Sequence, residues 1–181
     1  MRNQQVTHVE GIIFYVRGSH IWLCFVLPVA ALEAGRKNHT LPGGRIHQLG
    51  RHRRESVIDA MMRELQEETG TPGSAIRDLS MIGEPIEHLT AKREPKLVQG
   101  FVGVVTEQTV QPRLPQEIAE VRWHQVSEWH QLLATMNPGK QVLVLELLRQ
   151  ALFFRGLFPC IKRNIKVFLS EQSSKAIVLH A

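Results

Sequence analysis

Residues 55–70 read ESVIDAMMRELQEETG, and this stretch carries the start and stop signals of one helix. Ser56, followed three residues later by Asp59, has the spacing of a capping box, in which the serine accepts from backbone amides that lack helical partners. Gly70 supplies the left-handed residue that ends many helices, and the proline two residues later cannot continue one. We therefore predict a helix over residues 57–69.

The acidic side chains of this helix gather on one face. Successive residues advance by about 100°, so Glu64, Glu67 and Glu68 fall within an arc of roughly 100°. Glutamates at such spacings repel one another by about a few tenths of a kcal/mol per pair, and a hard cation such as Mg²⁺ removes that penalty. A solvated acidic face explains the same pattern equally well. An apolar stripe is expected beside the acids, formed by Ile58, Met61 and Leu65.

The surroundings of the helix favour the metal-binding interpretation. Residues 42–44 are Pro-Gly-Gly, and residues 55–70 (E-x7-R-E-L-x-E-E-x-G) resemble the signature of the Nudix hydrolase family, G-x5-E-x7-R-E-U-x-E-E-x-G-U, where U is bulky and aliphatic. Thr71 replaces the last aliphatic residue. Ten residues instead of five separate the second glycine from the glutamate, so residues 45–54 contain a five-residue insertion. A loop before the helix can bulge outward without changing the spacing of the helix side chains.

The resemblance implies a fold, an activity and a set of site residues. The fold is the α+β Nudix fold, a mixed β-sheet sandwiched between α-helices. The activity is hydrolysis of a nucleoside diphosphate linked to another group, by attack of water on a phosphorus, with Mg²⁺ or Mn²⁺ as cofactor. By motif position, Glu64, Glu67 and Glu68 would hold the metal together with a backbone oxygen of Gly43. Arg63 would brace the carboxylates, so the catalytic candidates are Glu64, Glu67 and Arg63.

The general base varies within the family, and several acids are candidates. Glu64 is one, and Glu117 and Glu120, which precede a predicted strand, are the others. A role for Glu117 and Glu120 as ordinary surface acids is equally open. We expect Asp59 to pair with Arg63 one turn later. Glu55 is expected to be structural.

Charge is distributed unevenly along the chain. The 181 residues include 22 Lys and Arg against 17 Asp and Glu, a formal net charge of +5 that favours contact with anions such as phosphates. Residues 36–54 hold six Lys or Arg residues and no acid. Substrate contact by this loop and plain solvation are both open. The candidate substrate-binding residues are Arg45, Arg51, Arg53 and Arg54.

Apolar segments on both sides of the helix predict the rest of the fold. Residues 11–16 and 21–27 flank a stretch of turn composition and predict a β-hairpin, and residues 30–54 predict a loop with one short strand ending at the glycines. Strands are expected at residues 96–106, with a bulge at Gly100 or Gly103, and at 119–124.

Two helices are expected near the end of this region. Ser127 is expected to cap a short helix through Leu133. Asn137, followed by a proline, opens a helix over residues 140–154. Apolar residues surround most of the circumference of this second helix, which predicts burial in the core or against another subunit.

One domain with an appendage is the simplest organisation. We predict a Nudix domain over residues 1–155 and an extension over residues 156–181 that covers the sheet or forms a homodimer. Cys24 and Cys160 make no metal or disulfide pattern, which favours a cytoplasmic location. The apolar run at residues 21–32 is shorter than the roughly 20 residues of a membrane helix, so no membrane association is expected, and a signal peptide is the weaker interpretation.

The substrate is the least determined property. An ADP-ribose-like molecule and a nucleoside triphosphate both fit the motif, and Pro85, 15 residues after Gly70, weakly favours ADP-ribose through the resemblance. Two other functions stay open: a Nudix-like module that senses a nucleotide without cleaving it, and removal of pyrophosphate from RNA 5′ ends. Nucleic acid is the weaker partner, because no basic surface interleaved with aromatic residues is visible.

Overall fold

Six strands form one mixed sheet in the computed structural model, which describes residues 5–35, 38–51, 53–89 and 94–178. The strand order is β4-β5-β1-β2-β6, and β3 pairs with β1 beside this path. β1 and β5 are parallel, and the other pairs are antiparallel. The strands are β1 (His8–Arg17), β2 (His20–Pro28), β3 (Gly43–Arg45), β4 (Ile76–Leu89), β5 (Pro95–Val105) and β6 (Ile118–Gln125).

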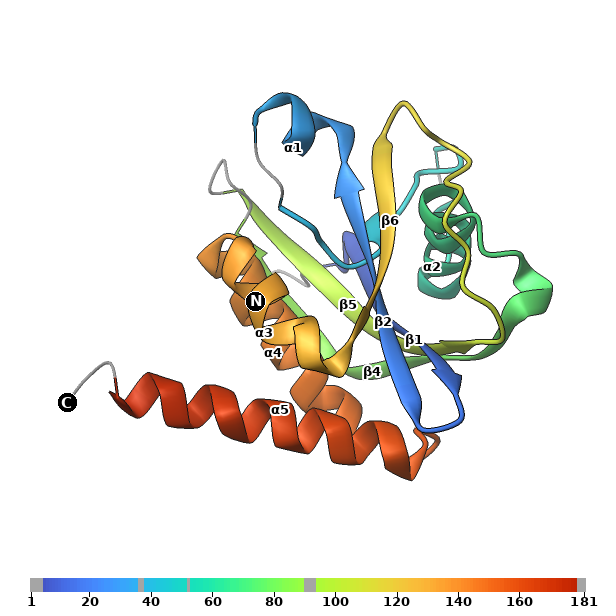
Figure 1. Ribbon diagram of the computed structural model, residues 1–181. Coiled ribbons are helices and arrows are strands. Elements are labelled where there is room, and N and C mark those ends of the chain that lie inside the picture. The colour runs from blue at the N-terminus through green and yellow to red at the C-terminus, as the bar shows by residue number, and fades with distance from the viewer. Residues whose placement is uncertain (1–4, 36–37, 52, 90–93, 179–181) are drawn as a thin grey trace.

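Helices cover both faces of this sheet, which confirms the predicted mixed sheet sandwiched between α-helices (Figure 1). α2 lies on one face, and α3, α4 and α5 lie on the other. The alternation of β1 residues accounts for two cores, because Val9 and Ile13 pack with α2 whereas Ile12 and Phe14 pack with α3 to α5. The helices are α1 (Val29–Glu33), α2 (Val57–Glu64), α3 (Trp129–Thr135), α4 (Pro138–Phe153) and α5 (Pro159–Val178).

The hairpin prediction is confirmed, whereas the prediction for the short strand is wrong in its position. β1 and β2 pair up to Arg17 and His20, and Gly18 has a φ of 60° in the two-residue turn between them. The short strand β3 contains the two glycines instead of ending at them, because Gly43 and Gly44 pair with β1.

The predicted bulge lies in the neighbouring strand. β5 keeps an unbroken register with β1 through Gly100 and Gly103, while the register of β4 shifts between Ile82 and Ile86. A Cβ at Gly100 would lie 2.3 Å from a leucine methyl of α4, so this glycine allows close packing of the helix on the sheet. The side-chain amide of Gln99 donates to the Ile82 carbonyl at 3.1 Å, so this carbonyl has a hydrogen-bond partner where the bulge begins.

Three local expectations about the helices are corrected. Ile58 is 46% exposed, because the buried face of α2 is centred on its neighbours Ala60 and Met61. Gln125, not Ser127, caps the short helical turn before α3, in a capping box with a glutamate. α4 begins at Pro138 and buries only one face, and its Phe153 is 83% exposed.

The chain after residue 155 forms a long helix that the sequence analysis did not assign. α5 contributes Ile161, Ile165 and Phe168 to the core cluster shared with α3 and α4. This packing agrees with an extension that covers one side of the sheet, while the boundary at residue 155 stays a prediction. Within the described ranges, no helix combines the length and apolar character needed to cross a membrane.

Candidate active site

The acidic face of the central helix ends in a wide turn. Residues 57–69 are helical as predicted, but α2 changes to a π-helical turn at Leu65–Thr69 before Gly70, which has a φ of 75°. The Thr69 hydroxyl donates to the Leu65 carbonyl at 2.6 Å within this turn. Such π turns are rare and occur frequently at functional sites. Here the turn carries two of the three predicted metal ligands.

Arg63 links the acids of the motif. Its Nη1 donates to Glu64 Oε1 at 2.9 Å and to Glu67 Oε2 at 2.8 Å. Its Nε and Nη2 donate to the two carboxylate oxygens of Glu55 at 2.9 and 3.1 Å. Asp59 bonds instead to Ser56, so the expected pairing of Asp59 with Arg63 is wrong. The guanidinium therefore fixes Glu64 and Glu67 relative to an acid that lies before the helix.

Glu55 holds this guanidinium from a protected position. Burial alone would raise the pKa of Glu55, but the hydrogen bonds from Arg63 and from the His47 amide hold it below its ordinary value. The side chain is 9% exposed and accepts from the His47 amide at 3.0 Å. These contacts agree with the structural role expected for Glu55.

The insertion closes on itself and leaves the motif in place. Leu49 donates its amide to the Arg53 carbonyl at 2.8 Å, and Glu55 donates its amide to the His47 carbonyl at 3.0 Å. These bonds form a small hairpin whose two ends lie next to each other. The extra residues therefore bulge outward as expected, and Glu55 returns to the end of β3.

The glycines of β3 lie against two of the carboxylates. The Gly43 amide donates to Glu68 Oε2 at 2.7 Å. A Cβ added to Gly44 would lie 2.2 Å from Glu64 Oε1, and one added to Gly43 would lie 2.3 Å from the Val9 carbonyl oxygen. Glycine fits both positions because other atoms come close: the Glu64 carboxylate at Gly44 and the β1 backbone at Gly43.

Burial makes the charged forms of two acids costly. Desolvation raises the pKa of Glu64, although the nearby Arg63 opposes the shift. Desolvation is also the largest cause for Glu68, and Glu64 and Glu10 add to it, so its pKa rises to about 8 despite the Gly43 hydrogen bond. A cation beside these carboxylates would stabilise their charged forms.

The donor set suits a hard divalent cation, although its side chains are turned to other partners. In the ranges that the structure describes, no three His, Cys, Asp or Glu side chains converge as a metal site. Glu67 is bonded to Arg63, and Glu68 is bonded to the Gly43 amide. All the predicted ligands offer oxygen, and burial raises the pKa values of Glu64 and Glu68, so a cation beside them would favour their charged forms. The residues therefore fit Mg²⁺ in chemistry, and Glu67 and Glu68 would exchange their present partners for the metal.

The two additional candidates for the base lie around β6. Glu120 is on the strand, where it pairs with Arg122 at 2.5 Å and with His39 at 3.7 Å. Glu117 is exposed in the turn before β6. Among the described residues, Arg63 bonds to neither of these two acids, so neither joins the cluster of carboxylates that it holds. Their role as base stays a prediction.

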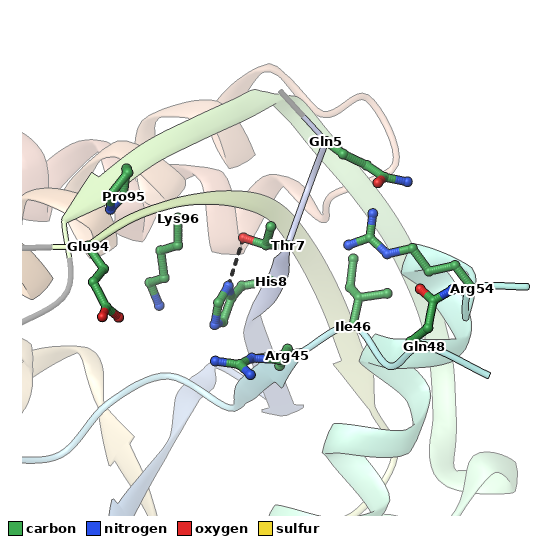
Figure 2. A pocket seen from close by; sticks show the side chains of 10 residues that line it. All are labelled: Gln5, Thr7, His8, Arg45, Ile46, Gln48, Arg54, Glu94, Pro95 and Lys96. Atoms are coloured by element: carbon green, nitrogen blue, oxygen red, sulfur yellow. Dashed lines mark hydrogen bonds between the residues drawn. The ribbon is translucent and has the colours of Figure 1, made fainter. Parts of the chain in front are cut away.

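The four arginines predicted to bind substrate separate into two pairs. Arg45 and Arg54 line a cavity at the start of β1 and β5 (Figure 2). Arg51 and Arg53 are exposed on the outside of the insertion and are not among the residues that line this cavity. The structure therefore gives only the first pair a shared, concave environment.

A buried charge cluster that the sequence pattern did not predict lies next to the carboxylates. Glu10 Oε1 accepts from Lys96 Nζ at 3.2 Å and from Lys140 Nζ, while Glu10 Oε2 is buried without a hydrogen bond. The two ammonium groups lower the pKa of Glu10 against the opposing effect of its burial. Glu10, a lone acid directly before the predicted strand at residues 11–16, was the signal that could have revealed this cluster.

Comparison with known proteins identifies the family. The model of the NUDIX domain matches residues 12–147, which include the glycines, the insertion and the acidic helix. The chain therefore belongs to the Nudix family.

One curated relative and two solved structures are similar to this chain. The Rattus norvegicus protein named bis(5'-nucleosyl)-tetraphosphatase [asymmetrical] is 30% identical over 95 residues, which span 49% of this chain and 64% of that protein, less than two thirds of its length. The NUDIX domain of Shewanella oneidensis NrtR, solved with ADP ribose, aligns with a TM-score of 0.60 at 16% identity over 83% of this chain and 90% of that chain. A C. elegans Ap4A hydrolase binary complex aligns with a TM-score of 0.56 at 14% identity over 94% and 99%. The two structural likenesses confirm the fold.

Proposed function

We propose that the protein is a Mg²⁺-dependent pyrophosphohydrolase that cleaves a nucleoside diphosphate linked to another moiety, and that Mn²⁺ can replace Mg²⁺. The observation that carries the proposal is the cluster in which Arg63 joins Glu64 and Glu67 while Glu68 lies against Gly43. The name of the rat relative and the ADP ribose of the NrtR structure support a substrate with linked phosphates.

Each residue of the cluster has a task in this proposal. Glu64, Glu67 and Glu68 would hold the metal with a backbone oxygen of Gly43, and the bound metal would neutralise the diphosphate and make water more acidic. Arg63 keeps Glu64 and Glu67 in register with each other. Its contact with Glu55 supports this arrangement from outside the helix.

We propose Glu64 as the general base ahead of Glu117 and Glu120. Its carboxylate belongs to the cluster that would hold the metal and lies 2.9 Å from Arg63 Nη1, so it lies where the attacking water would be activated. Glu120 is instead paired with Arg122 and His39. The base step consists of proton transfer from the attacking water to Glu64 as the oxygen bonds to phosphorus and the leaving phosphate departs.

A nucleotide-sensing Nudix module without catalysis is the second candidate. It is favoured by the way Glu67 and Glu68 are turned to Arg63 and to the Gly43 amide, because such contacts have a structural value even without a metal. The complete set of motif acids favours catalysis, since a module that only binds has no need for all three.

A substrate panel separates the two candidates. Purified protein would be incubated with Mg²⁺ and ADP-ribose, nucleoside triphosphates, diadenosine polyphosphates, nucleotide sugars or 5′-triphosphate RNA, and the products would be resolved by chromatography. Catalysis predicts a nucleoside monophosphate or diphosphate product that disappears when the metal is chelated. Binding of a nucleotide, measured by calorimetry, without any product would instead establish the sensing module.

Assembly and location are further proposals. The exposed Val142 and Phe153 of α4 support a homodimer through this helix, which size measurement in solution would test. A cytoplasmic location rests on Cys24 and Cys160, both of which are free thiols.

A further inference from the structure

A cavity of about 460 Å³ lies where the first residues of β1 and β5 meet β3 and the insertion. Its size is within the range of small-ligand pockets. None of the predicted metal ligands lines it. The lining residues are Gln5, Thr7, His8, Arg45, Ile46, Gln48, Arg54, Glu94, Pro95 and Lys96 (Figure 2).

Positively charged side chains outnumber acidic ones in the lining of this cavity. Arg45 and Arg54 are permanent cations, Lys96 is a buried ammonium paired with Glu10, and Glu94 is the acid among the lining residues. In Figure 2 the His8 ring and the Lys96 ammonium point toward the Arg45 guanidinium, and Arg54 reaches in from the insertion on the other side. Several cations at separated points of one cavity are suited to a chain of phosphates rather than to one small anion.

The packing of the cavity holds two of its cations in place. The Lys96 side chain is 12% exposed, and its Nζ is 3.2 Å from Oε1 of the buried Glu10. Arg54 donates through Nη2 to the Val6 carbonyl. The strand register places His8 directly opposite Arg45, so both side chains lie on one face of the sheet.

The same cations affect His8. Burial and the nearby Lys96 and Arg45 lower the pKa of His8 to about 4, so its ring is neutral at pH 7 and can donate or accept one hydrogen bond. Lys96 and Arg45, which add to the larger effect of burial on this pKa, also attract anions.

β3 connects this cavity to the carboxylates. The Gly43 amide contacts Glu68, and the side chain of Arg45 lines the cavity two residues later, a separation of about 7 Å along a strand. The Arg45 carbonyl accepts from Arg63 at 2.9 Å, so the same strand is fixed to the acidic cluster. A phosphate chain that begins at the carboxylates can therefore extend into the cavity.

We propose that this cavity is a subsite for the additional phosphates of a phosphate-rich nucleotide, and that Arg54 of the insertion and Arg45 of β3 bind them. The proposal rests on the proposed function, and it narrows the substrate class. Nucleotides with three or more linked phosphates reach the subsite, whereas ADP-ribose has only the two phosphates that the carboxylate cluster requires.

Calorimetric titration with inorganic tripolyphosphate, with divalent cations chelated, tests the subsite without any turnover. The variants are Arg54→Gln and Arg45→Gln, and Arg53→Gln is the matched control because it removes the same charge from the outside of the same insertion. Each cavity variant is expected to weaken binding at least tenfold, and the control less than twofold. The His8 ring resonances are expected to shift on titration in the wild type.

Two results would overturn the subsite. One is a lack of tripolyphosphate binding by the wild type, and the other is an equal loss in Arg53→Gln and Arg54→Gln, which would indicate a diffuse effect of net charge. Melting temperatures identify a variant that fails to fold. If Arg54→Gln fails to fold, Arg45→Gln provides the test, because Arg45 contacts Arg63 only through its backbone carbonyl. Binding with no hydrolysis of any nucleotide would keep the subsite and reject the proposed function.

A second readout uses substrates. If the protein hydrolyses both diadenosine tetraphosphate and ADP-ribose, Arg54→Gln is expected to raise the KM for the tetraphosphate about tenfold and leave the KM for ADP-ribose within twofold. Equal changes for both substrates would contradict the assignment of additional phosphates to this cavity.

Discussion

Replacing Gly44 with alanine tests whether the close contact between β3 and the helix carboxylate positions the site. The new Cβ would lie 2.2 Å from Glu64 Oε1, whereas ordinary contact begins at 3.4 Å. Gly44 has an ordinary φ, so the backbone accepts alanine and the carboxylate must move instead. The required displacement is about 1.2 Å, from the difference between these two distances.

A displacement of this size is expected to lower the catalytic rate strongly. A misplacement of about 1 Å costs roughly 100-fold in rate, so we expect kcat to fall by about that factor and the apparent affinity for Mg²⁺ to fall with it. Gly73→Ala is the control, because a Cβ there would be 3.6 Å from its nearest neighbours. The assay is steady-state hydrolysis of the best substrate at several Mg²⁺ concentrations, with melting temperatures for both variants.

Two outcomes would refute this reasoning. Full activity and unchanged Mg²⁺ dependence in Gly44→Ala would mean that the position of Glu64 does not matter. A large fall in melting temperature would mean that the contact is structural rather than positional, since relief of the clash by a side-chain rotation leaves the fold intact.

The remaining predictions concern stability. Because the pKa of Glu55 is lowered, its stabilising effect is present above its ordinary pKa of 4.5 and is lost as the pH falls through the folded value. Glu55→Gln should therefore lower the free energy of unfolding by about 2 kcal/mol at pH 7, and denaturation at pH 3 should show a much smaller difference from wild type; equal differences at both pH values would contradict the pairing with Arg63. Glu10→Gln leaves two partly buried ammonium groups without an anion and should cost about 3 kcal/mol in urea denaturation, whereas the exposed Glu87→Gln should cost less than about 0.5 kcal/mol. Equal costs for the two variants would show that the cluster is not coupled.

Local signals explain which parts of the fold could be predicted. The helix at residues 57–69 and the hairpin at its N-terminal side are specified by caps, turn glycines and side-chain periodicity within a few residues. β4 was missed because the bulge around Gly83 and Pro85 interrupts its alternation. α5 was missed because it has many charged residues and its apolar face is defined only by packing against α3 and α4.

The same distinction applies to the candidate site. The motif residues could be named from sequence because the family resemblance carries them as a contiguous pattern. The partners of Arg63 differed from expectation, because Glu55 is brought near by the closure of the insertion hairpin rather than by helix spacing. Glu10, Lys96 and Lys140 come from three distant segments, so only the folded sheet and helix bring them together.

The central claim is that the carboxylates at the end of α2 hydrolyse a phosphate-linked nucleotide with a divalent metal. Glu67→Gln tests it most directly, because this side chain is 31% exposed and its replacement leaves the core intact. We predict that turnover of the best substrate with Mg²⁺ falls by at least about 100-fold while the melting temperature stays nearly unchanged. Full turnover by Glu67→Gln at saturating Mg²⁺ would contradict the account.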